Sequence, residues 1–467
     1  MWKALRSHSS QPVYHVLQGW RRRTERKARL RILIYGLNYA PELTGIGKYT
    51  GEMAAWLAQR GHDVRVVTAP PYYPAWRIRD DYRGSLYRTE RAPGQPTVHR
   101  TPLYVPAQPT GPKRIAHLCS FMLGSIPVML REMLRSPQIV FTVEPTLFGV
   151  PLALCVARAT GAASWLHVQD FEVDVAFDLG LLPAQGPVHD LARALDKFFT
   201  LAFDRISSVS TKMVEHSRAK GVPAGRAVLF PNWVDTGEIF PLSQEANRDN
   251  TIRRELSAIV PGIENKIILL YSGNMGEKQG LELLAPLAQA FAPGGALHDP
   301  RVLFLFCGDG TFRPQLERLA QHCPNVTLLP LQPLDRLNHL LNAADIHLLP
   351  QRAGAADLVM PSRLTGMLAS GRPVIAIAEP GTQVAEVVEG RGLVVPAQDT
   401  AALLAAVSRL VEDEALRLSL GRAARTYAVE HLGKQQVLER FESNLKALLQ
   451  DSSRKLIADG RQLTADS

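Results

Sequence analysis

Two short stretches of the sequence combine residue types that could bind a phosphate. In SGNMGEKQG (272–280), glycines surround Lys278, so backbone N–H groups can approach an anion while the lysine adds a positive charge. In MPSRLTGMLASGRP, Pro361 suits the first position of a helix and Ser362 stands beside it, which would leave N–H donors for a ligand. Arg363 could bind two phosphate oxygens at once. Together the two stretches predict a diphosphate site, whereas chain reversal would explain a single glycine-rich turn equally well.

A second group of residues could act on a hydroxyl group. His167 and Asp170 end the strand-like run ASWLHVQD, and a carboxylate within hydrogen-bond reach can accept the proton of an alcohol. The competing interpretations are a histidine held by its strand neighbours and an aspartate that caps a helix or a turn. No Asp-x-Asp follows a strand, and EVD at 172–174 is a poor substitute, so we expect a site without a metal ion.

The stretch ELTGIGKYTGEM looks at first like half of an ATP-binding loop. That loop needs a glycine five residues before Gly47 and a serine or threonine directly after Lys48, but the chain has Glu42 and Tyr49 there. The ATP interpretation therefore fails at both positions.

Strand-like and helix-like runs alternate along the chain, which predicts parallel sheets built from strand–helix–strand units. One series runs from RILIYG at 31–36 to RISSVS at 205–210, and a second begins with NKIILLYSGN at 265–274. The segment 72–112, rich in Pro, Tyr and Arg, is expected to be an irregular surface loop or a lid. We therefore expect two doubly wound α/β domains, with ligands in the crevice outside the carboxyl ends of their strands.

Bulk composition narrows the class of protein. At 467 residues the chain is too long for one hydrophobic core, and its hydrophobic content of 46% is ordinary for a globular protein. A net charge of +9 suggests an anionic partner. Nucleic acid is disfavoured, because the charge is spread along the chain and no recognition motif is present. The 4 cysteines lack metal-ligand spacing, which disfavours zinc and a disulfide framework and fits a reducing cytoplasm.

One apolar segment and one basic segment bear on membrane contact. The run at 115–130 is shorter than the ~20 residues of a membrane-spanning helix. Its basic flanks suit either a helix in the membrane interface or a core helix of the first domain. Residues 1–30 contain RRRTERKAR and no apolar signal region, so we expect a disordered basic arm. Residues 113–135 are the candidate contact with the inner face of the cytoplasmic membrane, and the expected location is cytoplasmic and peripheral on that membrane.

Taken together, the motifs resemble a GT-B glycosyltransferase of the large retaining family 4, and within it the colanic-acid-type transferases that build bacterial exopolysaccharide. The resemblance runs from about Arg31 to about Leu449. It rests on YGLNYAPELTGIGKYTGEMAAWLAQRGHDVRVVTAPPYYP, FPNWVD, YSGNMGEKQGLE, FCGDG and PSRLTGMLASGRPVIA. It implies two Rossmann-like domains across a cleft, no cofactor, and transfer of a sugar from a nucleoside diphosphate to a polyprenyl-diphosphate-linked oligosaccharide.

The resemblance also implies how the chain is divided. It predicts the disordered arm, an acceptor-side domain, a domain that binds the nucleotide sugar, and a helix that returns to the first domain before a tail. The corresponding ranges are 1–30, 31–235, 236–432 and 433–467.

Residue roles follow from the same resemblance. Gly45 and Gly47 would keep the backbone low beside the donor diphosphate, and Lys278 and Arg363 would stabilise the charge growing on that leaving group. Transfer with retention in this family is thought to use the departing phosphate to deprotonate the acceptor, so Asp170 would orient the acceptor hydroxyl. His167 would be the second catalytic candidate, in contact with the transferred sugar or the acceptor hydroxyl, and Ser362 would help to bind the donor diphosphate. Further candidates for substrate contacts are Gly273, Asn274, Asn232, Gly308, Thr382 and Glu386.

The chain departs from the family pattern at two places. Many members carry two glutamates with seven residues between them, the second of which binds the donor ribose, but this chain has Leu358 and Gly366 there. Ribose recognition therefore stays unassigned. Asn274 stands where the family usually has an arginine, and Arg363 would supply that charge.

Three questions of function remain open at this point. The resemblance points to GDP-fucose as one donor candidate, whereas the spacing of the motifs does not distinguish guanine from uracil. A sugar-nucleotide 2-epimerase would share the two-domain architecture. A membrane-attached assembly subunit without catalytic activity would fit the missing glutamates.

Overall fold

The computed structural model describes residues 29–465 except for 43–44, 109, 145–146, 172–173, 175–184, 277–278 and 352–359. The predictions made for residues 1–28 of the basic arm, for Lys278 and for Leu358 lie outside the described residues.

The first domain is built on an eight-stranded sheet in the order β3-β4-β2-β1-β5-β6-β7-β8. Neighbouring strands are parallel, except that β3 is antiparallel to β4. The strands are β1 (Arg31–Gly36), β2 (Asp63–Thr68), β3 (Arg88–Glu90), β4 (Thr97–Arg100), β5 (Ile139–Glu144), β6 (Ala163–Val168), β7 (Arg205–Ser208) and β8 (Ala227–Leu229). The helices are α2 (Gly45–Gln59), α3 (Gly111–Met133), α4 (Val150–Thr160), α6 (Pro187–Leu201) and α7 (Thr211–Ala219).

Helices cover both faces of this sheet, which explains why its central strands are apolar throughout. Side chains alternate between the faces along β1. Ile32 and Ile34 pack with α2 on one face, whereas Leu33 and Tyr35 pack with α3 and α4 on the other.

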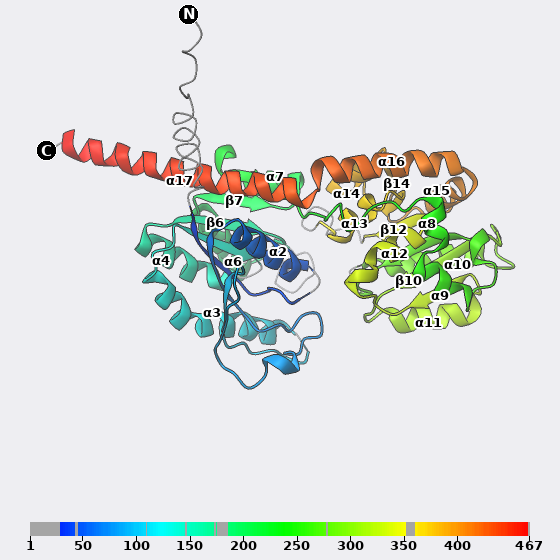
Figure 1. Cartoon of the computed structure of the whole chain (residues 1–467), viewed down its shortest axis with the longest axis horizontal. Coiled ribbons are helices and arrows are strands. Elements are labelled where there is room, and N and C mark those ends of the chain that lie inside the picture. The colour runs from blue at the N-terminus through cyan, green and yellow to red at the C-terminus, as the bar shows by residue number, and fades with distance from the viewer. Residues whose placement is uncertain are drawn as a thin grey trace, which may run out of the picture.

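The second domain is built on a six-stranded, all-parallel sheet in the order β11-β10-β9-β12-β13-β14. The strands are β9 (Ile267–Ser272), β10 (Val302–Cys307), β11 (Val326–Leu329), β12 (Ile346–Pro350), β13 (Val374–Ile377) and β14 (Gly392–Val395). The helices are α8 (Gln244–Arg248), α9 (Thr251–Ser257), α10 (Leu284–Phe291), α11 (Arg313–His322), α12 (Leu337–Ala343), α13 (Arg363–Ala369), α14 (Gln383–Val388), α15 (Thr400–Glu412) and α16 (Glu414–His431). The two domains form separate lobes (Figure 1), and the prediction of two parallel-sheet α/β domains is confirmed.

The chain crosses between the lobes twice, and the two crossings are paired. The N–H of Val234 donates to the carbonyl of Leu432 at 2.9 Å, and the N–H of Lys434 donates back to Val234 at 2.9 Å. Helix α17 (Lys434–Ala465) then runs back over the first domain (Figure 1). There Phe441 stacks on Phe230 with ring centroids 4.2 Å apart, inside the core that β1 and α2 share.

The prediction of an irregular segment over 72–112 is wrong in part. Strands β3 and β4 lie in it and extend the first sheet beyond β2, and α3 begins at Gly111. The strand β4 escaped detection because it carries polar residues: His99 and Arg100 are buried through hydrogen bonds and ion pairs rather than through apolar packing.

Helix α3 has one buried and one exposed side. The buried side includes His117, Phe121 and Met129, and it covers the first sheet as a core helix would. Leu123 and Leu130 point outward and are more than half exposed. In the part of the chain that the structure describes, no helix has the length and apolarity needed to cross a membrane.

Candidate active site between the two domains

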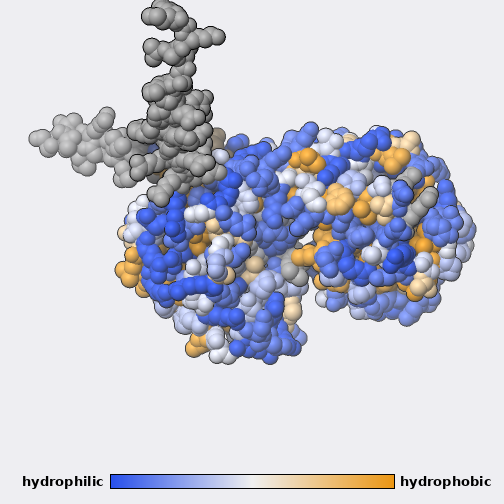
Figure 2. Space-filling view, viewed as in Figure 1, coloured by the Kyte–Doolittle hydropathy of each residue, from blue (hydrophilic) through white to orange (hydrophobic). Residues whose placement is uncertain are grey.

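Each sheet has a point where the strand order reverses, and such points are where open α/β sheets bind ligands. In the first sheet the reversal lies at β1, between β2 and β5; in the second it lies at β9, between β10 and β12. The two lobes face each other across a notch in the molecular surface (Figure 2). The hydroxyl of Tyr49 near the start of α2 lies close to Thr365 of α13, so the beginnings of these two helices are neighbours.

Arg363 occupies the reversal point of the second sheet. Its Nη1 donates to the hydroxyl of Tyr271 at 2.7 Å, and its Nη2 donates to Gln279 Oε1 at 2.9 Å and to the carbonyl of Pro350 at 3.2 Å. The guanidinium also lies 4.8 Å from the ring centre of Tyr271. Its buried Nε has no hydrogen-bond acceptor among the described residues. Three of the five N–H groups thus hold the guanidinium at the ends of β9 and β12, and the N–H groups left on Nε and Nη1 have no acceptor among the described residues.

The glycines that follow β9 and β10 have a packing function. Gly308 has φ +148°, and a Cβ there would lie 1.9 Å from the carbonyl oxygen of Gly273. The Gly273 N–H donates to Cys307 at 2.9 Å, so the two turns are joined by their backbones. Asn274 is exposed and accepts a hydrogen bond from the Tyr271 hydroxyl through its carbonyl. Substrate contacts predicted for Gly273, Asn274 and Gly308 stay predictions.

The helix after β12 starts later than predicted. Its first residue is Arg363, so the expectation that Pro361 occupies the first helical position is wrong. Ser362 is the N-cap residue, but its side chain makes no capping hydrogen bond because its backbone is already near helical, with φ −60° and ψ −26°. Asn232, on the first crossing between the lobes, is 6% exposed and lines a cavity of about 60 Å³ together with Pro361 and Thr365. Asn232 thus lies beside α13, at the junction of the domains.

Gly366 of α13 stands where many family members have the ribose-binding glutamate. A Cβ at this position would lie 3.2 Å from Cδ1 of Leu341, so a longer side chain would require that leucine to shift.

Glu42 organises the loop before α2. It is 5% exposed, and its Oε1 accepts the N–H groups of Tyr72 and Tyr73, each at 3.1 Å, while Oε2 accepts from Asn38 at 3.0 Å. Burial raises the pKa of this carboxyl. Gly47 makes room for it, since a Cβ at Gly47 would lie 2.7 Å from both Cβ and Oε2 of Glu42.

Asp170 lies near Tyr73 at the carboxyl end of β6. Burial and the negative charges of Asp170 and Glu42 raise the pKa of the Tyr73 phenol, and the charge of Arg114 at the start of α3 acts in the opposite direction. The predicted residue Asp170 is thus grouped with Glu42 and Tyr73, which the sequence did not single out. The signal in the sequence that pointed to Glu42 was its position as an acidic residue between the first strand and the Gly45-Ile46-Gly47 turn.

His167 lies in the core of the first domain. It is 4% exposed, and its Nδ1 and Nε2 lie 2.9 Å from Ser207 Oγ and 2.9 Å from Gln169 Nε2. Burial lowers the pKa of His167 to about 3, so the ring is neutral at physiological pH. These contacts match the interpretation of a histidine held by its neighbours, and its catalytic role stays a prediction.

The remaining candidates have structural contacts of their own. Thr382 caps α14, accepting from Ala385 N at 3.4 Å and donating to the Glu379 carbonyl at 2.8 Å. Glu386 forms an ion pair of 3.0 Å with Lys212 of the other lobe. Their substrate contacts stay predictions. Within the described ranges, no group of three or more His, Cys, Asp or Glu residues is placed to hold a metal ion.

Two family models match this chain, one on each lobe. Residues 44–233 match the Glycosyl transferase 4-like domain, and residues 253–427 match the Glycosyl transferases group 1 domain. The chain is 40% identical over 425 residues to WcaI of Escherichia coli, which is named as a colanic acid biosynthesis glycosyl transferase; the match covers 89% of this chain and 100% of WcaI. It is 24% identical over 291 residues to WbjE of Pseudomonas aeruginosa, named as a glycosyltransferase, covering 62% of this chain and 69% of WbjE.

Solved structures share the fold at low sequence identity. Sucrose-phosphate synthase from Thermosynechococcus elongatus superposes with a TM-score of 0.68 at 18% identity, covering 91% of this chain and 100% of that structure. Anabaena HepE in complex with UDP gives a TM-score of 0.64 at 14% identity, covering 90% and 100%. WaaG, a glycosyltransferase involved in lipopolysaccharide biosynthesis, gives 0.59 at 17% identity, covering 87% and 98%.

Proposed function

This chain belongs to the glycosyltransferases built from a 4-like and a group 1 domain, and on that premise we propose that it moves a sugar from a nucleoside diphosphate to a polyprenyl-diphosphate-linked oligosaccharide with retention of configuration. The observation that carries the donor assignment is the position of Arg363. Its guanidinium lies at the reversal point of the second sheet and keeps N–H donors there that have no acceptor among the described residues.

The donor diphosphate binds against Arg363 and the glycine turn after β9. Breaking the bond between the anomeric carbon and the diphosphate leaves negative charge on the departing oxygen, and preorganised cations at that point lower the barrier. Lys278 supplies a second charge in this proposal, and the two cations do what a metal ion does in other transferases.

The acceptor hydroxyl approaches from the first domain, beside Asp170 and Tyr73. As its oxygen bonds to the anomeric carbon, its proton passes to the departing diphosphate oxygen. Asp170 then orients the hydroxyl rather than taking its proton. Glu42 supports this side of the site by holding the backbone of the Tyr73 loop.

The pathway assignment rests on the similarity to WcaI, whose name refers to colanic acid biosynthesis. We propose exopolysaccharide synthesis on that basis, with GDP-fucose as one donor candidate. The complex of HepE with UDP is the reason to keep uridine donors in the same test. A lipid-linked acceptor places the enzyme in the cytoplasm and peripherally on the inner membrane, through residues 113–135.

A thermal-shift panel of GDP, UDP, CDP, ADP and dTDP tests the proposal. A diphosphate present at a hundred times its dissociation constant stabilises the folded protein by about 2.7 kcal/mol, which is a shift of roughly 5–10 °C for a domain of this size. One responding base would identify the donor. No shift with any diphosphate would contradict the donor site.

Variants of Arg363 then test its part in the donor site. Arg363→Gln should weaken the responding diphosphate by about tenfold or more, since a hydrogen bond to a charged group is worth about 1.5–3 kcal/mol. Arg318→Gln, an exposed arginine of the same domain, is the matched control and should leave binding unchanged. Equal affinities for both variants would remove Arg363 from the site. Incubating the enzyme with the sugar-nucleotide donor and no acceptor, followed by product analysis, distinguishes the two activities. A glycosyltransferase should slowly hydrolyse the donor, whereas a 2-epimerase would epimerise its sugar.

A further inference from the structure

A second cavity lies outside the crevice between the lobes. It has a volume of about 220 Å³ and separates the β3–β4 hairpin from the C-terminal half of α3. None of the residues assigned above to donor or acceptor lines it. The residues of its lining that matter here are Tyr87, Arg88, His99, Arg100, Pro127 and Arg131.

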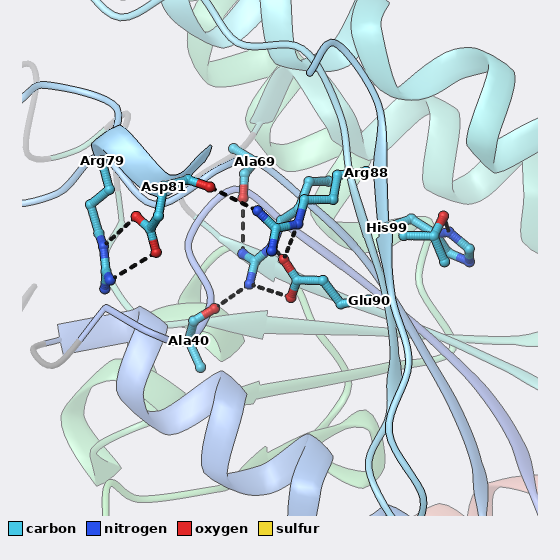
Figure 3. Close-up of polar contacts among 9 residues, drawn as sticks. Ala40, Ala69, Arg79, Asp81, Arg88, Glu90 and His99 are labelled. Carbon is cyan, nitrogen blue, oxygen red and sulfur yellow. Dashed lines mark hydrogen bonds and ion pairs between the residues drawn. The ribbon is translucent and has the colours of Figure 1, made fainter. Parts of the chain in front are cut away.

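The arginines of this cavity differ in how far they are already engaged. Arg100 uses four of its five N–H donors: it donates to both oxygens of Glu90 at 3.2 Å and to the carbonyls of Ala69 and Ala40. Arg88 donates to the carbonyl of Asp81 at 2.8 Å (Figure 3).

Arg131, on the opposite wall, is exposed. Its guanidinium makes no hydrogen bond or ion pair with any residue that the structure describes. The cavity therefore has two structurally committed arginines and one uncommitted arginine.

A buried contact between His99 and Glu132 forms the floor of the cavity. His99 is 2% exposed, its Nε2 lies 3.2 Å from Glu132 Oε1, and its Nδ1 lies 3.0 Å from Thr89 Oγ1. Burial acts to raise the pKa of Glu132, but the hydrogen bond with His99 and the charge of Arg65 outweigh it and lower that pKa. Glu132 also lies 3.7 Å from Arg135. The negative charge beneath the cavity is thus already compensated, and the lining as a whole carries an excess of positive charge.

Exposed apolar side chains surround this charged cavity. Leu123, Leu130 and Leu134 follow each other at intervals of seven and four residues, so they share one side of α3, and Leu134 is 86% exposed. Leu86, next to the cavity residue Tyr87, is 76% exposed on the neighbouring hairpin. Small orange areas interrupt the blue surface along the outer edge of this lobe in Figure 2. A ligand that suits both features carries an anionic oxygen group attached to a hydrocarbon chain.

Tyr87 holds the hairpin and the helix together across the cavity. Its hydroxyl donates to the carbonyl of Gly124 at 3.1 Å. Pro127, three residues further along α3, has no N–H for the helix. The opening therefore lies between a fixed hairpin and a locally interrupted helix.

We propose that this cavity binds the phosphate of an anionic phospholipid headgroup, with Arg131 as its principal ligand and the leucines of α3 in the acyl boundary. The inference rests on the membrane location proposed above and gives it a defined site. Charge complementarity selects the occupant, because phosphate oxygens match the guanidinium fork of Arg131 and the leucines beside it are more than half exposed.

Vesicle flotation with the full chain tests the site. Phosphatidylcholine vesicles with and without phosphatidylglycerol are compared for the native chain, Arg131→Gln and the charge-matched control Arg318→Gln. We expect Arg131→Gln to lower binding to the phosphatidylglycerol vesicles about tenfold or more, because it removes both the charge and the hydrogen bonds of the guanidinium to phosphate, and Arg318→Gln to have no effect. Equal binding of the two variants would overturn the proposal.

Arg131→Lys separates a built site from diffuse attraction. Lysine keeps the charge but lacks the planar fork, so the proposal expects a loss close to that of Arg131→Gln, whereas native-like binding by Arg131→Lys would overturn it. A thermal shift with inorganic phosphate that depends on Arg131, combined with no vesicle binding, would assign the cavity to a soluble phosphate and overturn the lipid proposal. The diphosphate panel is independent of Arg131, so failure of the proposed function and failure of this site are distinguishable.

Discussion

Replacing Gly47 by alanine tests how the loop before α2 is held together. A Cβ at Gly47 would lie 2.7 Å from Cβ and from Oε2 of Glu42, and 3.3 Å from the carbonyl oxygen of Tyr39. Contacts below 3.0 Å force a shift, and Glu42 cannot shift without disturbing the hydrogen bonds that it accepts from the N–H groups of Tyr72 and Tyr73.

The expected loss of stability follows from these contacts. A hydrogen bond to a charged group contributes about 1.5–3 kcal/mol, and losing one or both at Glu42 would cost roughly 2–5 kcal/mol. Alanine gains about 1 kcal/mol over glycine in a helix. We therefore expect Gly47→Ala to lower the free energy of unfolding by roughly 1–4 kcal/mol, as measured by urea denaturation followed by circular dichroism.

Gly45 provides a matched control two residues away. Its φ is +60°, but nothing lies within 4 Å of a Cβ built there. Gly45→Ala should therefore cost only the backbone strain, about 1–2 kcal/mol, and leave Glu42 in place.

A double-mutant cycle isolates the clash from other effects of the substitution. In a Glu42→Ala background, Gly47→Ala no longer meets a side chain at 2.7 Å, so its cost should disappear and the coupling energy should be at least about 1 kcal/mol. If Gly47→Ala costs the same in both backgrounds, the packing of Gly47 on Glu42 is not the reason for the glycine.

Three further predictions concern other parts of the molecule. Asp170→Asn should keep the affinity for the nucleoside diphosphate and lose turnover; retained turnover in a sugar-transfer assay would count against the orienting role. Phe441→Ala should lower the free energy of unfolding by about 3–5 kcal/mol because this ring is buried in the first core, and exposed Phe198→Ala, the control, should stay within about 0.5 kcal/mol. Contacts with His216 and Lys220 lower the pKa of the Asp174 carboxyl to about 2, against the effect of burial. This carboxyl should therefore contribute about 2 kcal/mol of stability above pH 4, which is lost as the pH falls through 2. Asp174→Asn should abolish this part of the pH dependence of unfolding, and an unchanged profile would refute the prediction.

Much of the fold is readable from the sequence because the central strands are continuous apolar runs. Strands β1, β6, β7 and β9 lie within the runs RILIYG, ASWLHVQD, RISSVS and NKIILLYSGN that predicted them. Strand β4 is different, since its buried His99 and Arg100 depend on Glu132 and Glu90 for compensation. Those partners lie up to 33 positions away, so no local pattern announces the strand.

In the candidate site, too, residues with a local sequence signal were predictable and residues that depend on distant partners were not. The position of Arg363 was predictable because it directly follows a buried strand and a loop. Glu42 was not, because its importance arises from backbone N–H groups 30 residues further along the chain. For His167 the sequence left two interpretations, and only the neighbouring Ser207 and Gln169 favour one of them.

The return of α17 also determines the order in which the protein can fold during synthesis. Phe441 packs on Phe230, Phe141 and Trp165, so the first domain lacks one wall of its core until α17 has been synthesised. The second domain, whose strands are contiguous from Ile267 to Val395, can be completed before it. Contacts of such large sequence separation form late, and unfinished apolar surface of this kind is prone to aggregation. We therefore expect a chain ending before α17 to release a folded second domain joined to an incompletely folded first one.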